Sequence, residues 1–136
     1  MADPSAPARQ SVSTVRVRYA ETDQMGVAYY ANYFVWFEVA RTDWLRSAGF
    51  TYREMEAGGV LLPVIDARCE YKSPARYDDA LAIRVVARVP SPARLAFDYA
   101  ITGPAGVIAV GSTVHASVDP TGRPIRMPAR IKELLR

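Results

Sequence analysis

The segment from Tyr29 to Gly49 reads YYANYFVWFEVARTDWLRSAG, and neither proline nor glycine occurs in it before the last residue. Because these two residues interrupt helices, their absence predicts one long helix over about residues 29–48, with Gly49 placed to end it. The apolar positions are Tyr33, Phe34, Val35, Trp36, Phe37, Val39, Ala40, Trp44 and Leu45. They cover most of the helix circumference, so we expect the rest of the chain to enclose the helix.

Strands are predicted on both sides of this helix. Apolar and polar residues alternate from Thr14 to Ala20, which predicts a half-buried first strand. After Leu62 the pattern again has a period of two, and turn residues separate four further strands. These strands lie near residues 63–73, 80–90, 94–103 and 106–119, and residues 129–136 suit a short terminal helix.

The order of these elements defines the fold class. A strand, one largely apolar helix and an antiparallel meander predict an α+β fold, in which a sheet of about five strands wraps around the helix. A cystatin-like roll, or another α+β roll, has a similar order of elements. With 136 residues the chain fits a single domain, predicted over residues 13–136 after a disordered tail of residues 1–12.

Composition excludes several kinds of site. Cys69 and His115 are the only residues of their types, which rules out an internal disulfide, a CxxC pair and a zinc site with the usual ligands. A catalytic pair of Cys69 with His115 is an alternative, although a single cysteine in an apolar strand is usually core filling. We therefore expect no metal site.

Charge and hydropathy bound the partners and the location. The net charge of +3 comes mainly from scattered arginines, so nucleic acid is not an expected partner. Every apolar stretch is much shorter than a membrane span, and residues 1–10 lack the apolar run of a secretory signal. We expect no membrane insertion and a cytoplasmic location.

A motif of tyrosines, an aspartate and a glycine precedes the predicted helix, in the segment RYAETDQMGVAYYANY of residues 18–33. Its residues are Tyr19, Asp23, Gly26, Tyr29, Tyr30, Asn32 and Tyr33. Their spacing resembles that of the 4-hydroxybenzoyl-CoA and short-chain acyl-CoA thioesterases, and the likeness covers about residues 14–119. The resemblance implies a hotdog fold, in which the sheet wraps around the central helix, and an enzyme that hydrolyses acyl-CoA thioesters.

The same resemblance assigns catalytic roles. Asp23 is expected to attack the thioester carbonyl carbon or to deprotonate a water molecule, and backbone amides at the helix N-terminus are expected to polarise the carbonyl. Tyr30 stands where many family members carry histidine, and it is expected to act through its backbone amide. The competing interpretation of Asp23 is a turn or helix-capping residue, and Glu38 and Glu21 are rival catalytic carboxylates.

The expected ligand is an acyl-CoA, with coenzyme A as part of the substrate and no separate cofactor. The predicted substrate-binding residues are Tyr19, Gly26, Val27, Tyr29, Pro63, Tyr71 and Lys72. The resemblance also implies a homodimer or a dimer of dimers, because a hotdog subunit leaves the edges of its sheet unpaired.

Two other functions have the same fold. A non-catalytic module would bind acyl-CoA or acyl carrier protein without needing Asp23. A dehydratase would need a histidine in the pocket, and His115 lies late in a strand, far along the chain from the motif. The sequence leaves the acyl group, aromatic or short-chain, open.

Overall fold

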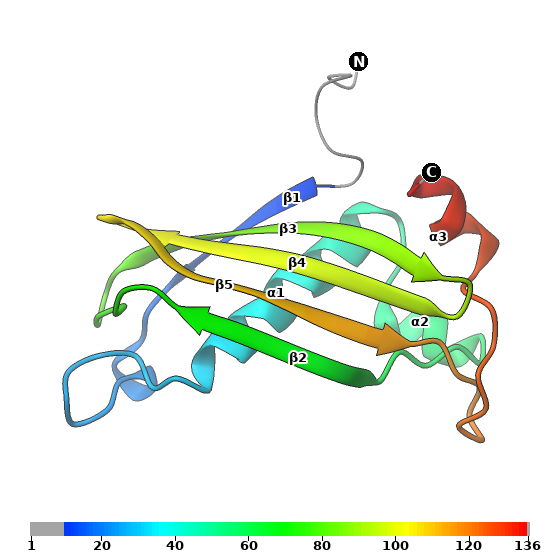
Figure 1. Cartoon of the computed structure of the whole chain (residues 1–136), viewed down its shortest axis with the longest axis horizontal. Coiled ribbons are helices and arrows are strands. Elements are labelled where there is room, and N and C mark those ends of the chain that lie inside the picture. Colours follow the sequence, from blue (N-terminus) through cyan, green and yellow to red (C-terminus); the bar gives the residue numbers. More distant parts are fainter. Residues whose placement is uncertain (1–9, 136) are drawn as a thin grey trace, which may run out of the picture.

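The computed structural model describes residues 10–135, and they form a five-stranded antiparallel sheet with the strand order β1-β3-β4-β5-β2. The strands are β1 (Gln10–Arg16), β2 (Val64–Tyr71), β3 (Ala80–Ser91), β4 (Arg94–Gly103) and β5 (Gly106–Ala116). The long helix α1 (Asn32–Ser47) lies along one face of this curved sheet (Figure 1). This arrangement confirms the predicted α+β architecture.

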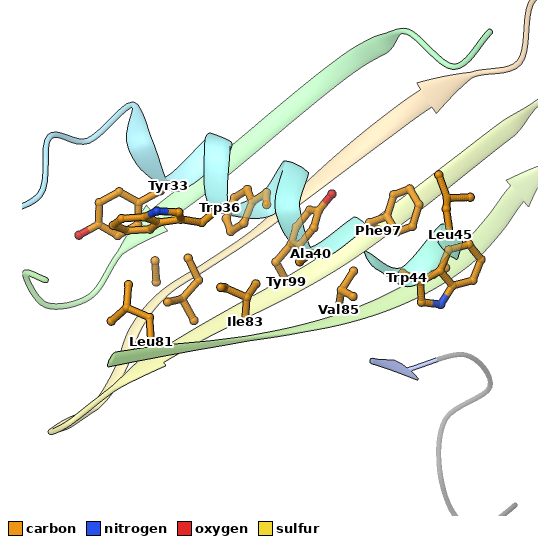
Figure 2. Close-up of a cluster of buried hydrophobic side chains, with 14 of the residues drawn as sticks. Tyr33, Trp36, Ala40, Trp44, Leu45, Leu81, Ile83, Val85, Phe97 and Tyr99 are labelled. Carbon is orange, nitrogen blue, oxygen red and sulfur yellow. The ribbon is translucent and has the colours of Figure 1, made fainter. Parts of the chain in front are cut away.

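The core lies between α1 and the sheet. The side chains of Trp36, Ala40 and Trp44 point from α1 toward Ile83 and Phe97 on the strands (Figure 2). These residues recur at helical spacing on one face of α1, while the strand residues alternate, so each element buries one face. The apolar interface fixes the position of α1 relative to the sheet.

The sheet covers one side of α1 only. Val35 and Val39 remain 49% and 36% exposed on the side that faces away from the sheet. The prediction that the chain encloses the helix is therefore wrong for the single subunit. Among residues 10–135 all five strands belong to the one sheet on which α1 packs, so no strand covers the outer side of the helix.

Several element boundaries differ from the predictions. β1 begins at Gln10 and ends at Arg16, because residues 19–21 form a short 3-10 helix, η1 (Tyr19–Glu21). Residues 10–12, which we predicted to be part of the tail, thus belong to the sheet, while residues 1–9 lie outside the described range. α1 begins three residues late, because the Tyr29 amide donates to the Glu21 carbonyl (2.8 Å).

Two short helices complete the chain. α2 (Tyr52–Ala57), which the sequence did not predict, follows the end of α1 and is capped by the Thr51 side chain. The predicted terminal helix is present as α3 (Ala129–Leu134), and its Ile131 is fully buried. Within residues 10–135, no helix is long and apolar enough to cross a membrane.

The strand β2 lies at one edge of the sheet. It pairs with β5 along one side, and the described residues offer no partner along the other. Its ends are close to different parts of the molecule: the strand starts beside α2 and finishes near the N-terminus of α1 (Figure 1).

Candidate functional site

The loop before α1 holds Asp23 in a tight turn. The Asp23 amide donates to the Val27 carbonyl (2.9 Å), and the Gly26 amide donates back to the Asp23 carbonyl (3.0 Å). Gly26 has a φ of 79°, which residues with a side chain rarely adopt, so the sequence needs glycine here. One carboxylate oxygen, Oδ1, accepts the Met25 amide (2.9 Å). The other oxygen has no hydrogen-bond partner among residues 10–135, and it remains available for chemistry.

Glu21 attaches this loop to α1. Its buried carboxylate accepts the Arg18 amide (2.8 Å) on Oε1 and the Trp36 indole N–H (3.2 Å) on Oε2. Its carbonyl accepts the Tyr29 amide and the Asn32 side-chain amide, both at 2.8 Å. Both carboxylate oxygens of Glu21 therefore accept hydrogen bonds, and through them Glu21 ties the loop that carries Asp23 to α1.

Hydrogen-bond donors lie at the start of α1. The amides of Tyr30 and Ala31 have no acceptor among the described residues, because helix N-termini leave their first N–H groups unpaired. The Tyr30 carbonyl accepts the hydroxyl of Tyr71 (2.9 Å). Burial raises the pKa of Tyr71 to about 12, so the hydroxyl stays protonated and holds the turn to β2. These two free amides could stabilise a developing oxyanion.

Two cavities adjoin Asp23. The first, of about 350 Å³, is lined by Asp23, Met25, Val27, Ala28, Tyr30, Tyr33, Tyr71, Lys72, Ser73 and Pro74. The second, of about 570 Å³, is lined by Tyr19, Thr22, Asp23, Gln24, Gly26 and Tyr77. Tyr29 packs on Tyr30, with ring centroids 4.6 Å apart. All but one of the predicted site residues therefore gather around the Asp23 loop.

Pro63 is the exception. It precedes β2, whereas Tyr71 ends that strand, and eight residues of extended chain separate them by about 25 Å. Pro63 lines a third cavity of about 490 Å³ together with Glu38, Arg41, Tyr52, Glu56, Leu61, Leu62, His115 and Val118. Within one subunit, the structure therefore separates both Pro63 and the rival carboxylate Glu38 from the Asp23 loop.

The sequence did not predict the contact between Arg41 and Tyr52 in this third cavity. Arg41 Nε donates to the hydroxyl of Tyr52 (3.2 Å), a residue of α2. The only available signal was a cation within a largely apolar helix, which does not indicate the residue that the cation contacts. No ion pair joins Glu38 and Arg41 in the described part of the chain.

His115 is a buried, neutral side chain. It is 1% exposed, and burial lowers its pKa to about 4. Its Nδ1 donates to the Leu62 carbonyl (3.0 Å), and its Nε2 accepts the Thr113 hydroxyl (3.0 Å). Cys69 faces Gly111 across the sheet, while His115 faces Val64, so the two side chains do not form a catalytic pair. Both ring nitrogens of His115 therefore form hydrogen bonds within the fold.

Acid is expected to destabilise the protein through His115. The unfolded chain binds a proton near the ordinary pKa of 6.5, but the folded chain does so only near 4. The free energy of unfolding that depends on neutral His115 is fully present above the pKa of the unfolded chain. It falls by up to about 3 kcal/mol as the pH drops toward the pKa of the folded chain. Urea unfolding at several pH values measures this loss, and His115→Gln should make the pH dependence shallower. Identical pH profiles for the two proteins would contradict this account.

Metal binding has no candidate among the described residues. Residues 10–135 contain no group of three or more histidine, cysteine, aspartate or glutamate side chains that could hold a metal ion.

Comparisons with known proteins give relatives over nearly the whole chain. Residues 17–135 match the model of the thioesterase-like superfamily. YneP of Bacillus subtilis (strain 168), named provisionally as an acyl-CoA thioesterase, is 41% identical over 110 residues, which are 80% of each chain. YbgC of Haemophilus influenzae, an acyl-CoA thioesterase, is 29% identical over 120 residues, 87% of this chain and 88% of its own.

Solved structures of thioesterases have the same fold as this chain. The crystal structure of the DHNA-CoA thioesterase from Staphylococcus aureus superposes with a TM-score of 0.86 at 35% identity, covering 92% of this chain and 87% of its own. A 4-hydroxybenzoyl-CoA thioesterase variant bound to 4-hydroxybenzoyl-CoA superposes with a TM-score of 0.85, covering 95% of this chain and 100% of its own. At 20% identity, the latter shows the shared fold alone.

Proposed function

Because the chain belongs to the thioesterase-like superfamily and is a hotdog-fold acyl-CoA thioesterase, we propose that Asp23 drives its hydrolysis of acyl-CoA thioesters. The observation that carries the proposal is the free carboxylate oxygen of Asp23, on a loop that Glu21 holds against the unpaired amides of α1. A nucleophile or base and oxyanion donors are the two elements that acyl transfer to water requires.

The proposed reaction begins with the thioester carbonyl near the N–H groups of Tyr30 and Ala31. These donors stabilise the negative charge that develops on the carbonyl oxygen. In one route, the Asp23 carboxylate attacks the carbonyl carbon, the C–S bond breaks to release CoA thiolate, and water then hydrolyses the acyl-Asp23 anhydride. In the other, Asp23 removes a proton from the attacking water. Both routes yield the free acid and CoA, and neither needs a metal or a separate cofactor.

The cavity beside Tyr30 supports an aromatic or short-chain acyl group as substrate. Tyr30, Tyr33 and Tyr71 supply aromatic walls, and a volume of about 350 Å³ suits a group of modest size. DHNA-CoA, the substrate named for the Staphylococcus aureus relative, carries an aromatic acyl group. Lys72, at the rim, is suited to a phosphate of CoA, since the only partner of its side-chain ammonium in the described structure is the exposed Glu70 (3.3 Å).

A second copy of the chain is proposed to pair with β2. Val64, Ile65 and Tyr71 are about half exposed along this free edge. On the outer face, negative and positive side chains alternate in the order Asp66, Arg68, Glu70 and Lys72. An antiparallel pairing about a two-fold axis at Cys69 sets Arg68 opposite Glu70 of the partner subunit and Asp66 opposite Lys72 of the partner subunit. Every charge on this face then meets its opposite.

This register predicts a specific crosslink. In it, Cys69 lies directly opposite Cys69 of the partner subunit, at a Cα separation of about 5 Å that a disulfide can span. A mild oxidant should therefore give a covalent dimer on non-reducing gels. Cys69→Ser should remove the crosslink, and Arg68→Glu should weaken the dimer in sedimentation. A monomer in solution, or a dimer whose cysteines do not crosslink, would contradict the register.

The proposed function is tested by following free thiol released from a panel of aromatic and aliphatic acyl-CoA thioesters. Wild-type protein and Asp23→Asn are compared at equal concentration. The expected results are given in the Discussion.

A further inference from the structure

The start of α1 has no side-chain cap. Ala31 stands at the N-cap position, and no side chain of residues 10–135 accepts a capping hydrogen bond there. Most helices place serine, threonine, aspartate or asparagine at this position, because their side chains pair with the first N–H groups. With alanine instead, the N–H groups of Tyr30 and Ala31 stay unpaired. The conformation of this turn therefore depends on contacts from other elements.

Tyr71, at the end of β2, makes the shorter of two contacts with the Tyr30 carbonyl. The Tyr33 amide donates to this oxygen at 3.4 Å, which is long for an N–H···O hydrogen bond. The Tyr71 hydroxyl donates to the same oxygen at 2.9 Å, within the ordinary range. Tyr71 therefore restrains the Tyr30 carbonyl more strongly than the helix itself does.

Tyr71 is held firmly by its own surroundings. It pairs with Ala109 of β5, and the next residue, Lys72, donates its amide to the Ile108 carbonyl (2.7 Å). Its ring meets the ring of the buried Tyr33 edge-on, with centroids 4.8 Å apart. Because both backbone and ring are fixed, the hydroxyl is a rigid reference point for the turn.

The Tyr30 carbonyl and the Ala31 N–H belong to the same peptide group. None of the peptide bonds among residues 10–135 is cis, so these two groups lie in one plane and point in opposite directions. A contact that fixes the carbonyl therefore also fixes the direction of the N–H. A hydrogen bond to the carbonyl also polarises the peptide group, which makes its N–H a stronger donor.

We propose that Tyr71 is a positioning residue for hydrolysis, whose hydroxyl holds the Tyr30–Ala31 peptide group in the orientation that stabilises the oxyanion. The inference rests on the proposed hydrolysis at Asp23. Tyr71 acts through the backbone of Tyr30, without touching the reacting atoms. Oxyanion donors accelerate a reaction only when they are aimed at the charge that develops in the transition state. Loss of the hydroxyl should therefore affect the transition state more than the bound substrate.

Tyr71→Phe tests the inference, because it keeps the ring and removes only the hydroxyl. Single-turnover rates of thiol release and KM are measured with whichever of benzoyl-CoA, 4-hydroxybenzoyl-CoA and hexanoyl-CoA the wild type hydrolyses fastest. The rate should fall roughly tenfold, less than the loss of about 10²–10³-fold when an oxyanion donor is removed outright. KM should stay within about twofold, because the ring still lines the cavity. A raised KM with an unchanged rate would overturn the positioning role.

Tyr99→Phe is the matched control for a loss of stability. It removes a phenolic hydroxyl that bonds the Thr113 hydroxyl in the core (2.6 Å), and Tyr99 lines neither of the cavities beside Asp23. It should lower the melting temperature, because a buried hydrogen bond is lost, and leave the rate within about twofold. Equal rate losses in Tyr99→Phe and Tyr71→Phe would show that the rate follows stability, and would overturn the inference.

The infrared band of the thioester carbonyl supplies a readout that stability does not move. The same thioester, labelled with ¹³C at its carbonyl carbon, is bound to Asp23→Asn and to Asp23→Asn/Tyr71→Phe. Donors aimed at the carbonyl oxygen weaken the C=O bond and lower its stretching frequency, so the band of the double variant should lie closer to that of the free thioester.

An unchanged carbonyl band would overturn the role of Tyr71, while inactivity of Asp23→Asn would still support hydrolysis at Asp23. Absence of turnover by the wild-type protein would instead overturn the proposed function, and this inference with it.

Discussion

Asp23→Asn is expected to lower kcat for acyl-CoA hydrolysis by roughly a thousandfold, the scale of losing a positioned base or nucleophile. Asparagine has the same shape and keeps an oxygen that can accept the Met25 amide, so the loop should retain its conformation. What it lacks is the negative charge that attacks the carbonyl carbon or takes a proton from water. The binding of substrate should change little, so the loss should appear in kcat and not in KM.

Glu38, the rival catalytic carboxylate, provides a variant to compare with Asp23→Asn. Glu38→Gln removes a carboxylate from α1 that lines a different cavity from Asp23 in its own subunit. Thiol release and melting temperature are measured for both variants. Full activity in Asp23→Asn together with an inactive, folded Glu38→Gln would move the catalytic role to Glu38.

Phe37→Ala is expected to lower the free energy of unfolding by about 3–5 kcal/mol, the usual cost of removing a large aromatic ring from a core. The Phe37 side chain is fully buried and stacks on Tyr99, with ring centroids 4.2 Å apart. It also fills the space beside Gly111, where an added Cβ would lie 2.7 Å from the ring. Alanine would leave a cavity that the surrounding sheet cannot collapse to fill.

Urea unfolding at fixed protein concentration measures this effect, since a dimer would make stability depend on concentration. Phe37→Leu, which keeps most of the volume, should cost about 1–1.5 kcal/mol. Arg53→Ala, on the exposed side of α2, should stay within about 0.5 kcal/mol of the wild type. A loss below about 1 kcal/mol for Phe37→Ala would contradict the central place of this ring in the core.

The elements that could be predicted well are those in which the spacing of apolar residues along the sequence matches the buried face. The strands β3 and β4 have alternating patterns with one buried face, and their predicted ranges match the structure closely. The start of α1 was less predictable, because residues 29–31 have helix-compatible side chains but are held in a turn by Glu21, a residue outside the helix. The short helix α2 lies between glycines in a segment too short to show a helical period.

Some residues of the site could likewise be predicted from the sequence, and others could not. Asp23 and Gly26 were identified because the spacing of their motif resembles that of a known family, and in the structure this motif forms one local turn. The Arg41–Tyr52 contact could not, because it joins two helices whose relative direction depends on the loop between them. Pro63 was grouped with Tyr71 correctly only if a second subunit is present, since one chain holds them at opposite ends of β2.

The measurement that tests the central claim most directly is thiol release by the purified wild-type protein from aromatic and aliphatic acyl-CoA thioesters, with binding followed in parallel by calorimetry. The account predicts saturable turnover of at least one thioester, with free acid and CoA formed in equal amounts. Tight acyl-CoA binding without thiol release above the rate in buffer would contradict it, and would identify a module that binds acyl-CoA without hydrolysing it.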